Sequence, residues 1–93
     1  MTVKVKFFSN FREKTGEAVT EVDAGTAGDL LDELFNRYED IKDSVVEETD
    51  SGMEIKSGIT VMVNGRNVRF LDGLDTELEN GDTVAIFPPV GGG

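Results

Sequence analysis

One stretch of helical periodicity, residues 26–41, lies among short segments that alternate apolar and polar residues, and this order constrains the fold most strongly. Its apolar residues recur at helical spacing: Leu30, Leu31, Leu34, Phe35, Tyr38 and Ile41. Thr26 can cap the first turn, with Asp29 three residues later. Because a single helix covers only one face of a sheet, the pattern predicts a two-layer α+β domain.

Five segments have the alternation or the apolar composition of strands. They are residues 3–7, 18–22, 59–63, 66–70 and 83–87. Asn64-Gly65, between the third and the fourth, is a strong hairpin signal. The first and last segments are the most apolar, so we expect them side by side in the centre. This order predicts a β-grasp, the ubiquitin-like roll: a mixed sheet of about five strands with one main helix packed on one face.

The connections carry weaker signals. A loop is expected between the first two strands, and residues 42–58 are expected to contain a short strand or a helical turn. Leu74 and Leu78, which precede the last strand, are predicted to fill part of the core. The β-grasp domain is predicted to span residues 1–87, and residues 88–93 to form a flexible C-terminal tail that ends in Gly-Gly.

The charge of the chain limits its partners. The 93 residues include nine Lys and Arg and nineteen Asp and Glu, which gives a formal net charge of −10. Nucleic acid and anionic membranes are therefore poor partners, because both attract basic residues. The excess acid keeps a small protein soluble, steers it toward a basic partner, or reflects a salt-adapted host. The chain has no signal-peptide pattern and no apolar run near the roughly 20 residues of a membrane span, so a cytoplasmic protein is expected.

The chain contains no Cys and no His. Disulfides, iron–sulfur ligation, the usual zinc sites and most nucleophile–base catalysis are therefore excluded. The acidic run Glu47-Glu48-Thr49-Asp50 does not have the ligand spacing of a calcium loop, so a solvated loop is expected there. No catalytic residue and no metal site are predicted.

The C-terminal end is the segment with a specific chemical interpretation. Pro88-Pro89 cannot continue a strand ladder, and Gly91, Gly92 and Gly93 follow after Val90. A frayed terminus or a cloning remnant would have the same composition. Alternatively, a backbone without Cβ atoms suits entry into a narrow channel of a partner, where a terminal carboxylate can be captured. That carboxylate would be a reactant that an external enzyme must activate.

Several motifs resemble those of the MoaD/ThiS family of ubiquitin-like proteins. The similar blocks are Val3-Lys4-Val5-Lys6-Phe7-Phe8 with Phe11-Arg12-Glu13, Val63-Asn64-Gly65, Leu78 to Val90, and the terminal glycines. The resemblance spans nearly the whole chain and is weakest over residues 42–58. The family includes the small subunit of molybdopterin synthase, ThiS sulfur carriers and archaeal small ubiquitin-like modifiers.

The resemblance implies a carrier that is not itself an enzyme. An activating adenylyltransferase, of the MoeB or ubiquitin-activating kind, would use ATP and Mg²⁺ to adenylate the Gly93 carboxylate. A sulfurtransferase would then form a thiocarboxylate for molybdopterin synthesis, or the terminus would be joined to a target lysine. Gly92 and Gly93 match the di-glycine of the family, and Gly91 takes its variable preceding position. The carrier itself would bind no cofactor.

The expected docking face follows from the strand alternation. Phe8 and Phe87 are out of phase with the predicted core residues of their strands, and Met62 is out of phase with its neighbours. All three would lie on the helix-free face of the sheet. The resemblance implies that the aromatic positions contact the activating enzyme or the large subunit of molybdopterin synthase. Pro88, Pro89, Val90 and Gly91 are the remaining expected partner-binding residues.

Three functions remain open from the residues alone. The first is a sulfur carrier for molybdopterin synthesis. The second is a modifier joined to lysines of other proteins or to one of the chain's own five: Lys4, Lys6, Lys14, Lys42 and Lys56. The third is a plain protein-interaction module with an inert tail.

Overall fold

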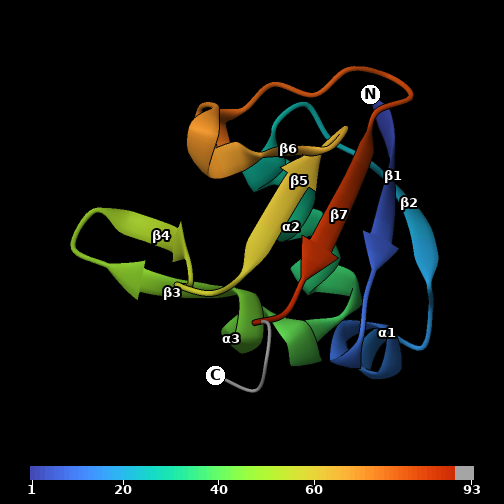
Figure 1. Cartoon of the computed structure of the whole chain (residues 1–93), viewed down its shortest axis with the longest axis horizontal. Helices are drawn as coiled ribbons and strands as arrows, with labels where there is room; N and C mark the ends of the chain where they lie inside the picture. The colour runs from blue at the N-terminus through green and yellow to red at the C-terminus, as the bar shows by residue number, and fades with distance from the viewer. Residues whose placement is uncertain (90–93) are drawn as a thin grey trace.

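The first and last strands, β1 (Thr2–Phe7) and β7 (Thr83–Phe87), lie side by side in the centre of a five-stranded sheet (Figure 1). In this computed structural model, which describes residues 1–89, the two strands run parallel, with Val5 opposite Val84. Alternate residues of both strands are buried, as the period-two pattern requires. The predicted central pair is confirmed.

The remaining strands complete a mixed sheet. β2 (Val19–Asp23) pairs antiparallel with β1, and β5 (Thr60–Val63) pairs antiparallel with β7. A tight turn at Asn64-Gly65 leads into β6 (Arg66–Asn67), as the hairpin signal predicts. The strand order β2-β1-β7-β5-β6 is that of the predicted β-grasp.

The fourth predicted strand is shorter than expected. Only Arg66 and Asn67 pair with β5, and the next three residues form a 3-10 turn, η2 (Val68–Phe70). The Asn67 side chain accepts a hydrogen bond from the Arg69 N–H at 2.9 Å, which caps this turn and ends the strand. Val68 is thereby buried, whereas Phe70 is 87% exposed.

The main helix, α2 (Ala27–Arg37), covers one face of the sheet and lies behind the strands in Figure 1. Its predicted start is confirmed, because Thr26 Oγ1 accepts a hydrogen bond from the Asp29 N–H at 3.1 Å. Its buried side chains are Ala27, Leu30, Leu31, Leu34 and Phe35. Within residues 1–89, no helix covers the opposite face of the sheet, which faces the viewer in Figure 1.

The end of this helix differs from the prediction. Tyr38 leaves the helical region with φ −130°, and a 3-10 turn, η1 (Glu39–Ile41), follows. Ile41 is fully buried from this turn, so its apolar character reflects the core and not a longer helix. Tyr38 packs edge-on against Phe7, with ring centroids 5.5 Å apart.

The core lies between α2 and the covered face of the sheet. The strands contribute Val3, Val5, Phe7, Val22, Val61, Val63, Val84 and Ile86. Leu78 is buried, as predicted, and Leu74 is half-buried against the core. Leu74 lies just after the start of η3 (Gly73–Asp75).

The sequence did not predict a short helix, α1 (Asn10–Thr15), in the expected loop between β1 and β2. Phe11 is its one buried residue, so the segment has no repeating apolar pattern. The Gly16 N–H donates to the Arg12 carbonyl at 2.9 Å and closes its end.

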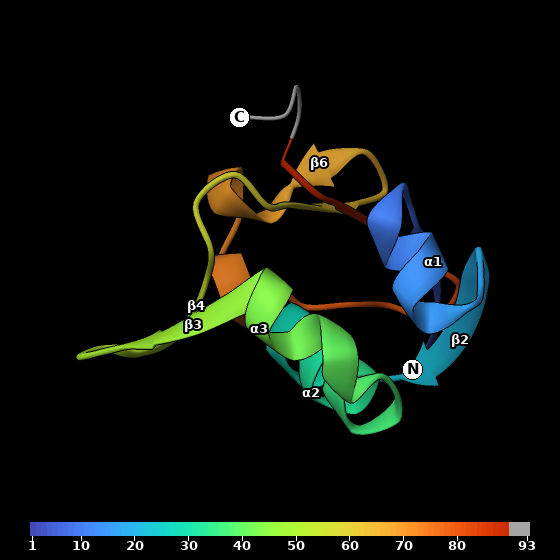
Figure 2. The same cartoon turned by 90° about the horizontal axis from the view of Figure 1, so that it is seen from below.

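Residues 42–55 contain both of the expected alternatives. A helical turn, α3 (Lys42–Val45), leads into a hairpin of β3 (Val46–Thr49) and β4 (Gly52–Ile55). The hairpin forms a sheet of its own and projects to one side of the molecule (Figures 1 and 2). None of the helices within residues 1–89 has the length and apolar character that a membrane crossing requires.

Candidate functional site

Two phenylalanine rings stack at the ends of the central strands. Phe8 and Phe87 have ring centroids 4.4 Å apart and ring planes inclined by 16°. The parallel register places Phe7 opposite Ile86, both buried, so the next residue of each strand turns toward the helix-free face. Each ring is half-buried in this chain. Their predicted placement on one face is confirmed.

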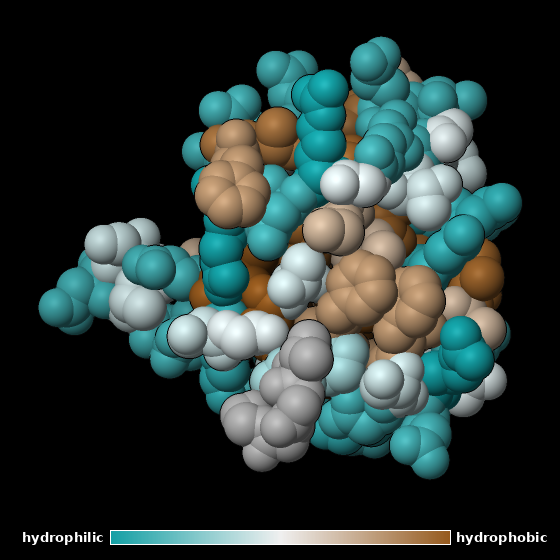
Figure 3. Space-filling view, viewed as in Figure 1, coloured by the Kyte–Doolittle hydropathy of each residue, from teal (hydrophilic) through white to brown (hydrophobic). Residues whose placement is uncertain are grey.

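Met62 extends this aromatic pair across the neighbouring strands. It lies opposite Ala85 of β7, and Thr60 lies opposite Phe87. Both Met62 and Ala85 are half-buried on the helix-free face. We call Phe8, Met62, Ala85 and Phe87 the sheet patch. The space-filling view of this face has an apolar area near its centre, surrounded by polar side chains (Figure 3).

The strand that borders the sheet patch is basic. Lys4 and Lys6 are exposed and out of phase with the buried Val5, so they point to the same face as the sheet patch. In the strand ladder, Lys6 lies between Val19 and Ala85. Lysine can lay its apolar stem along such neighbours while its ammonium group stays in water.

Most of the acidic side chains lie elsewhere. On the helix-free face, β2 contributes Glu21 and Asp23 at the edge of the sheet. The exposed acids of α2, η1 and the hairpin are Asp29, Asp32, Glu33, Glu39, Asp40, Glu47, Glu48, Asp50 and Glu54. Although the chain has a net charge of −10, the centre of the helix-free face of the sheet is therefore apolar and basic.

The chain after β7 stays close to the body for two more residues. Pro88 is half-buried and Pro89 is exposed. A methyl group placed on Gly58 would lie 3.5 Å from both Cβ and Cγ of Pro89. β7 ends at Phe87, directly before the Pro-Pro pair, as the sequence predicts. The chain does not point away from the body at once, because Pro89 lies near Gly58, an approach that the sequence did not indicate. Val90, Gly91, Gly92 and Gly93 lie outside the described residues.

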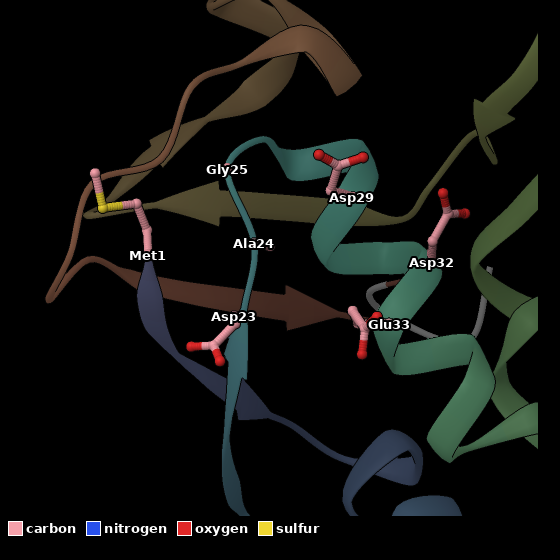
Figure 4. A pocket seen from close by; sticks show the side chains of 7 residues that line it. All are labelled: Met1, Asp23, Ala24, Gly25, Asp29, Asp32 and Glu33. Carbon is pink, nitrogen blue, oxygen red and sulfur yellow. The ribbon is translucent and has the colours of Figure 1, made fainter.

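An acidic hollow occurs near the start of α2 (Figure 4). It is lined by Met1, Asp23, Ala24, Gly25, Asp29, Asp32 and Glu33. Its carboxylates belong to exposed residues and point in different directions. Within residues 1–89, no group of three or more Asp or Glu is arranged to hold a metal ion. The sheet patch and the chain that follows it remain the candidate site.

Comparison with known proteins assigns the family. A model of the ThiS family matches residues 5–93, which include the terminal glycines and all of the sheet except the first three residues of β1. The chain belongs to the ThiS family. Small archaeal modifier protein 3 of Haloferax volcanii is 38% identical to it, with both chains covered in full. The sulfur carrier protein CysO of Mycobacterium tuberculosis is 30% identical, again over the full length of both.

Solved structures of this family share the fold. Small archaeal modifier protein 1 of Methanosarcina acetivorans superposes with a TM-score of 0.90 at 35% identity, covering 99% of this chain and 96% of the other. CysO in the BexX/CysO complex of Amycolatopsis orientalis gives 0.85 at 35% identity, covering 98% and 99%. This ThiS-family chain is therefore a ubiquitin-like β-grasp protein related to sulfur carriers and protein modifiers.

Sequence reasoning missed two features of the site. The first is the position of Lys6 beside the sheet patch, which the alternation around Val5 indicates once β1 and β7 are neighbours. The second is the approach of Pro89 to Gly58, which depends on the pairing of β5 with β7. No local motif marks this second feature.

Proposed function

We propose that this chain is a sulfur carrier whose Gly93 carboxylate is adenylated by an ATP-dependent activating enzyme and converted to a thiocarboxylate. The sulfur would then be donated in molybdopterin synthesis. The observation that carries the proposal is the match of the ThiS family model through Gly93, a few residues after a folded domain that has an apolar sheet patch. The sulfur carrier CysO, similar over its full length, supports the carrier role.

Adenylation is needed because a carboxylate is a poor acyl donor. A Gly93 oxygen attacks the α-phosphorus of ATP, and pyrophosphate leaves. A sulfur nucleophile then attacks the activated acyl carbon, and AMP leaves. ATP, Mg²⁺ and the catalytic groups belong to the partner enzymes in this scheme. This chain supplies the carboxylate and the surface that places it.

The sheet patch is the proposed docking surface for the activating enzyme and for the large subunit of molybdopterin synthase. Stacked rings that are half-exposed beside Met62 offer the kind of aromatic anchor that dominates many interfaces. The four patch residues come from the three neighbouring strands β1, β7 and β5 or directly follow them, so the surface is preformed. The CysO relative that forms a complex with BexX supports a partner-bound role.

A second function is favoured by a different observation. The relative that is 38% identical over its full length is a small archaeal modifier protein. We therefore propose conjugation of Gly93 to lysines of target proteins as the alternative. Both functions use the same activated terminus, so they differ only in whether sulfur or a lysine amine attacks the adenylate.

Deletion of Gly92 and Gly93 tests the proposal. Both residues follow the described domain, so we expect an unchanged unfolding midpoint and a complete loss of ATP–pyrophosphate exchange with the cognate activating enzyme. Full-length chain must support exchange in the same assay. Normal exchange with the truncated chain would exclude activation at Gly93. Absence of exchange with the full-length chain as well would favour an interaction module with an inert tail.

A further inference from the structure

A hollow with apolar walls lies between the projecting hairpin and the turns that follow β6. Met53 and Ile55 of β4 contribute to one wall, and Val68, Arg69 and Leu74 of η2 and η3 contribute to the other. Both walls lie on the same side of the molecule in Figure 1, where η2 and η3 are orange. The hollow has a volume of about 310 Å³ and shares no residue with the sheet patch. We call it the hairpin hollow.

The two walls of the hairpin hollow are joined by one side chain. Arg69 Nη2 donates to the carbonyls of Ile55 at 3.3 Å and of Lys56 at 2.8 Å. Met53, Ile55 and Leu74 pack against the core and remain half-exposed in the hollow. The hollow is therefore preformed, and binding there needs little reordering of the chain.

An exposed aromatic ring stands beside the hairpin hollow. Phe70 is 87% exposed and follows Arg69, which lines the hollow, and the next residue, Leu71, is 37% exposed. Single exposed apolar residues are ordinary, but two of them beside an apolar hollow form the kind of contiguous patch that marks an interface. The hollow has room for such a ring, because a cavity of about 150 Å³ already holds benzene.

The two sides of the hairpin hollow differ in charge. Residues 66–71 contain Arg66 and Arg69 and no acid, and the next acid is Asp72. Residues 46–55, which form the hairpin, contain no base. The exposed acids of the hairpin are Glu47, Glu48, Asp50 and Glu54. The basic turn of one copy is therefore complementary in charge to the hairpin of another.

We propose that two copies of this chain associate about a two-fold axis, with Phe70 of each copy inserted into the hairpin hollow of the other. The ring and the hollow are neighbours on one surface, so a two-fold contact uses both at once and closes at two copies. The same contact places the basic turn of each copy against the acidic hairpin of the other. The net charge of −10 per copy opposes association, so we expect a weak dimer with a Kd of roughly 10 μM to 1 mM.

Sedimentation equilibrium of the full chain tests this dimer. The buffer contains about 1 M salt, which shortens the range of charge repulsion to about 3 Å. The wild-type chain should dimerise, and Phe70→Asp should raise the Kd at least tenfold, because it places a carboxylate in an apolar hollow. Val19→Asp is the matched control and should leave the Kd unchanged. Val19 is 45% exposed on β2, at the opposite edge of the sheet from β6.

Dilution of the isotope-labelled chain locates the contact by NMR. The backbone amide signals of Met53, Ile55 and Leu74 should shift with concentration in the wild type and stay constant in Phe70→Asp. A chain that remains monomeric at about 1 mM overturns the inference. Equal weakening by Phe70→Asp and Val19→Asp, or concentration-dependent shifts confined to the sheet patch, overturns it as well. A monomer whose hollow signals shift only when the activating enzyme is added would make that enzyme the occupant, which also overturns it.

Discussion

Truncation of the stacked phenylalanine rings should weaken the fold and the docking surface together. Phe8 and Phe87 are both half-buried, and their ring centroids are 4.4 Å apart. Complete burial would make a Phe→Ala change cost about 3–5 kcal/mol, so we expect roughly 1–2 kcal/mol for each of these rings. Stacking itself contributes about 0.5–1.5 kcal/mol beyond burial, and this part is lost in either single variant.

A double-mutant cycle measures the shared part directly. The free energy of unfolding of Phe8→Ala, Phe87→Ala and the double variant should show a coupling of about 1 kcal/mol between the two rings. Each kcal/mol corresponds to a lowering of the melting temperature by about 4–8 °C for a domain of this size. A coupling of zero would mean that the rings do not interact in solution.

The same rings should act in binding. Phe8→Asp or Phe87→Asp should weaken binding to the activating enzyme at least tenfold, or about 1.4 kcal/mol, in a calorimetric titration of the folded variant. Phe70→Asp is the matched control, because Phe70 is 87% exposed on a turn outside the sheet patch. Equal losses for Phe70→Asp and the patch variants would refute the assignment of the docking surface. Unchanged binding of both patch variants would refute it as well.

Two further predictions concern the helix start and the charge of the sheet face. Thr26→Ala should lower the free energy of unfolding by about 1 kcal/mol, whereas Thr26→Ser should retain most of it, because the hydroxyl caps α2; equal urea midpoints for the wild type and Thr26→Ala would contradict this. Lys6→Glu should weaken binding to the activating enzyme by roughly tenfold at low salt, and less at high salt, because it places an acid beside the sheet patch. Lys42→Glu makes the same charge change at the start of α3 and should have little effect; equal losses would place the electrostatic contact elsewhere.

The sequence predicts the central elements of the fold because their patterns are periodic and complete. Val3, Val5 and Phe7 mark one face of β1, and the leucines of α2 mark one face of a helix. The short elements lack such patterns. α1 has one buried residue, Phe11, and the hairpin has few apolar side chains, with exposure that alternates in β4 but not in β3. Ile41 has helical spacing but lies in a separate turn, since burial alone does not specify the backbone conformation.

The part of the candidate site that could be predicted is the part that follows from the alternation of side chains along the strands. Phe8 and Phe87 meet because β1 and β7 are parallel neighbours, and alternation then fixes the face on which they lie. The approach of Pro89 to Gly58 arises from the register of two strands that are distant in sequence. In the sequence, Gly58 cannot be distinguished from an ordinary turn residue. Its position depends on how β5 and β7 pair, and a local sequence pattern does not specify the pairing of distant strands.

The most direct test of activation at Gly93 is the intact mass of the chain purified from its native host, with the C-terminal peptide sequenced by fragmentation. We predict a species in which sulfur replaces one oxygen of the Gly93 carboxylate, and we expect this species to be absent from a host that lacks the activating enzyme. A ladder of conjugates through Gly93 without this species would establish the modifier function instead. An unmodified carboxylate in every preparation, with no conjugate, would contradict the account.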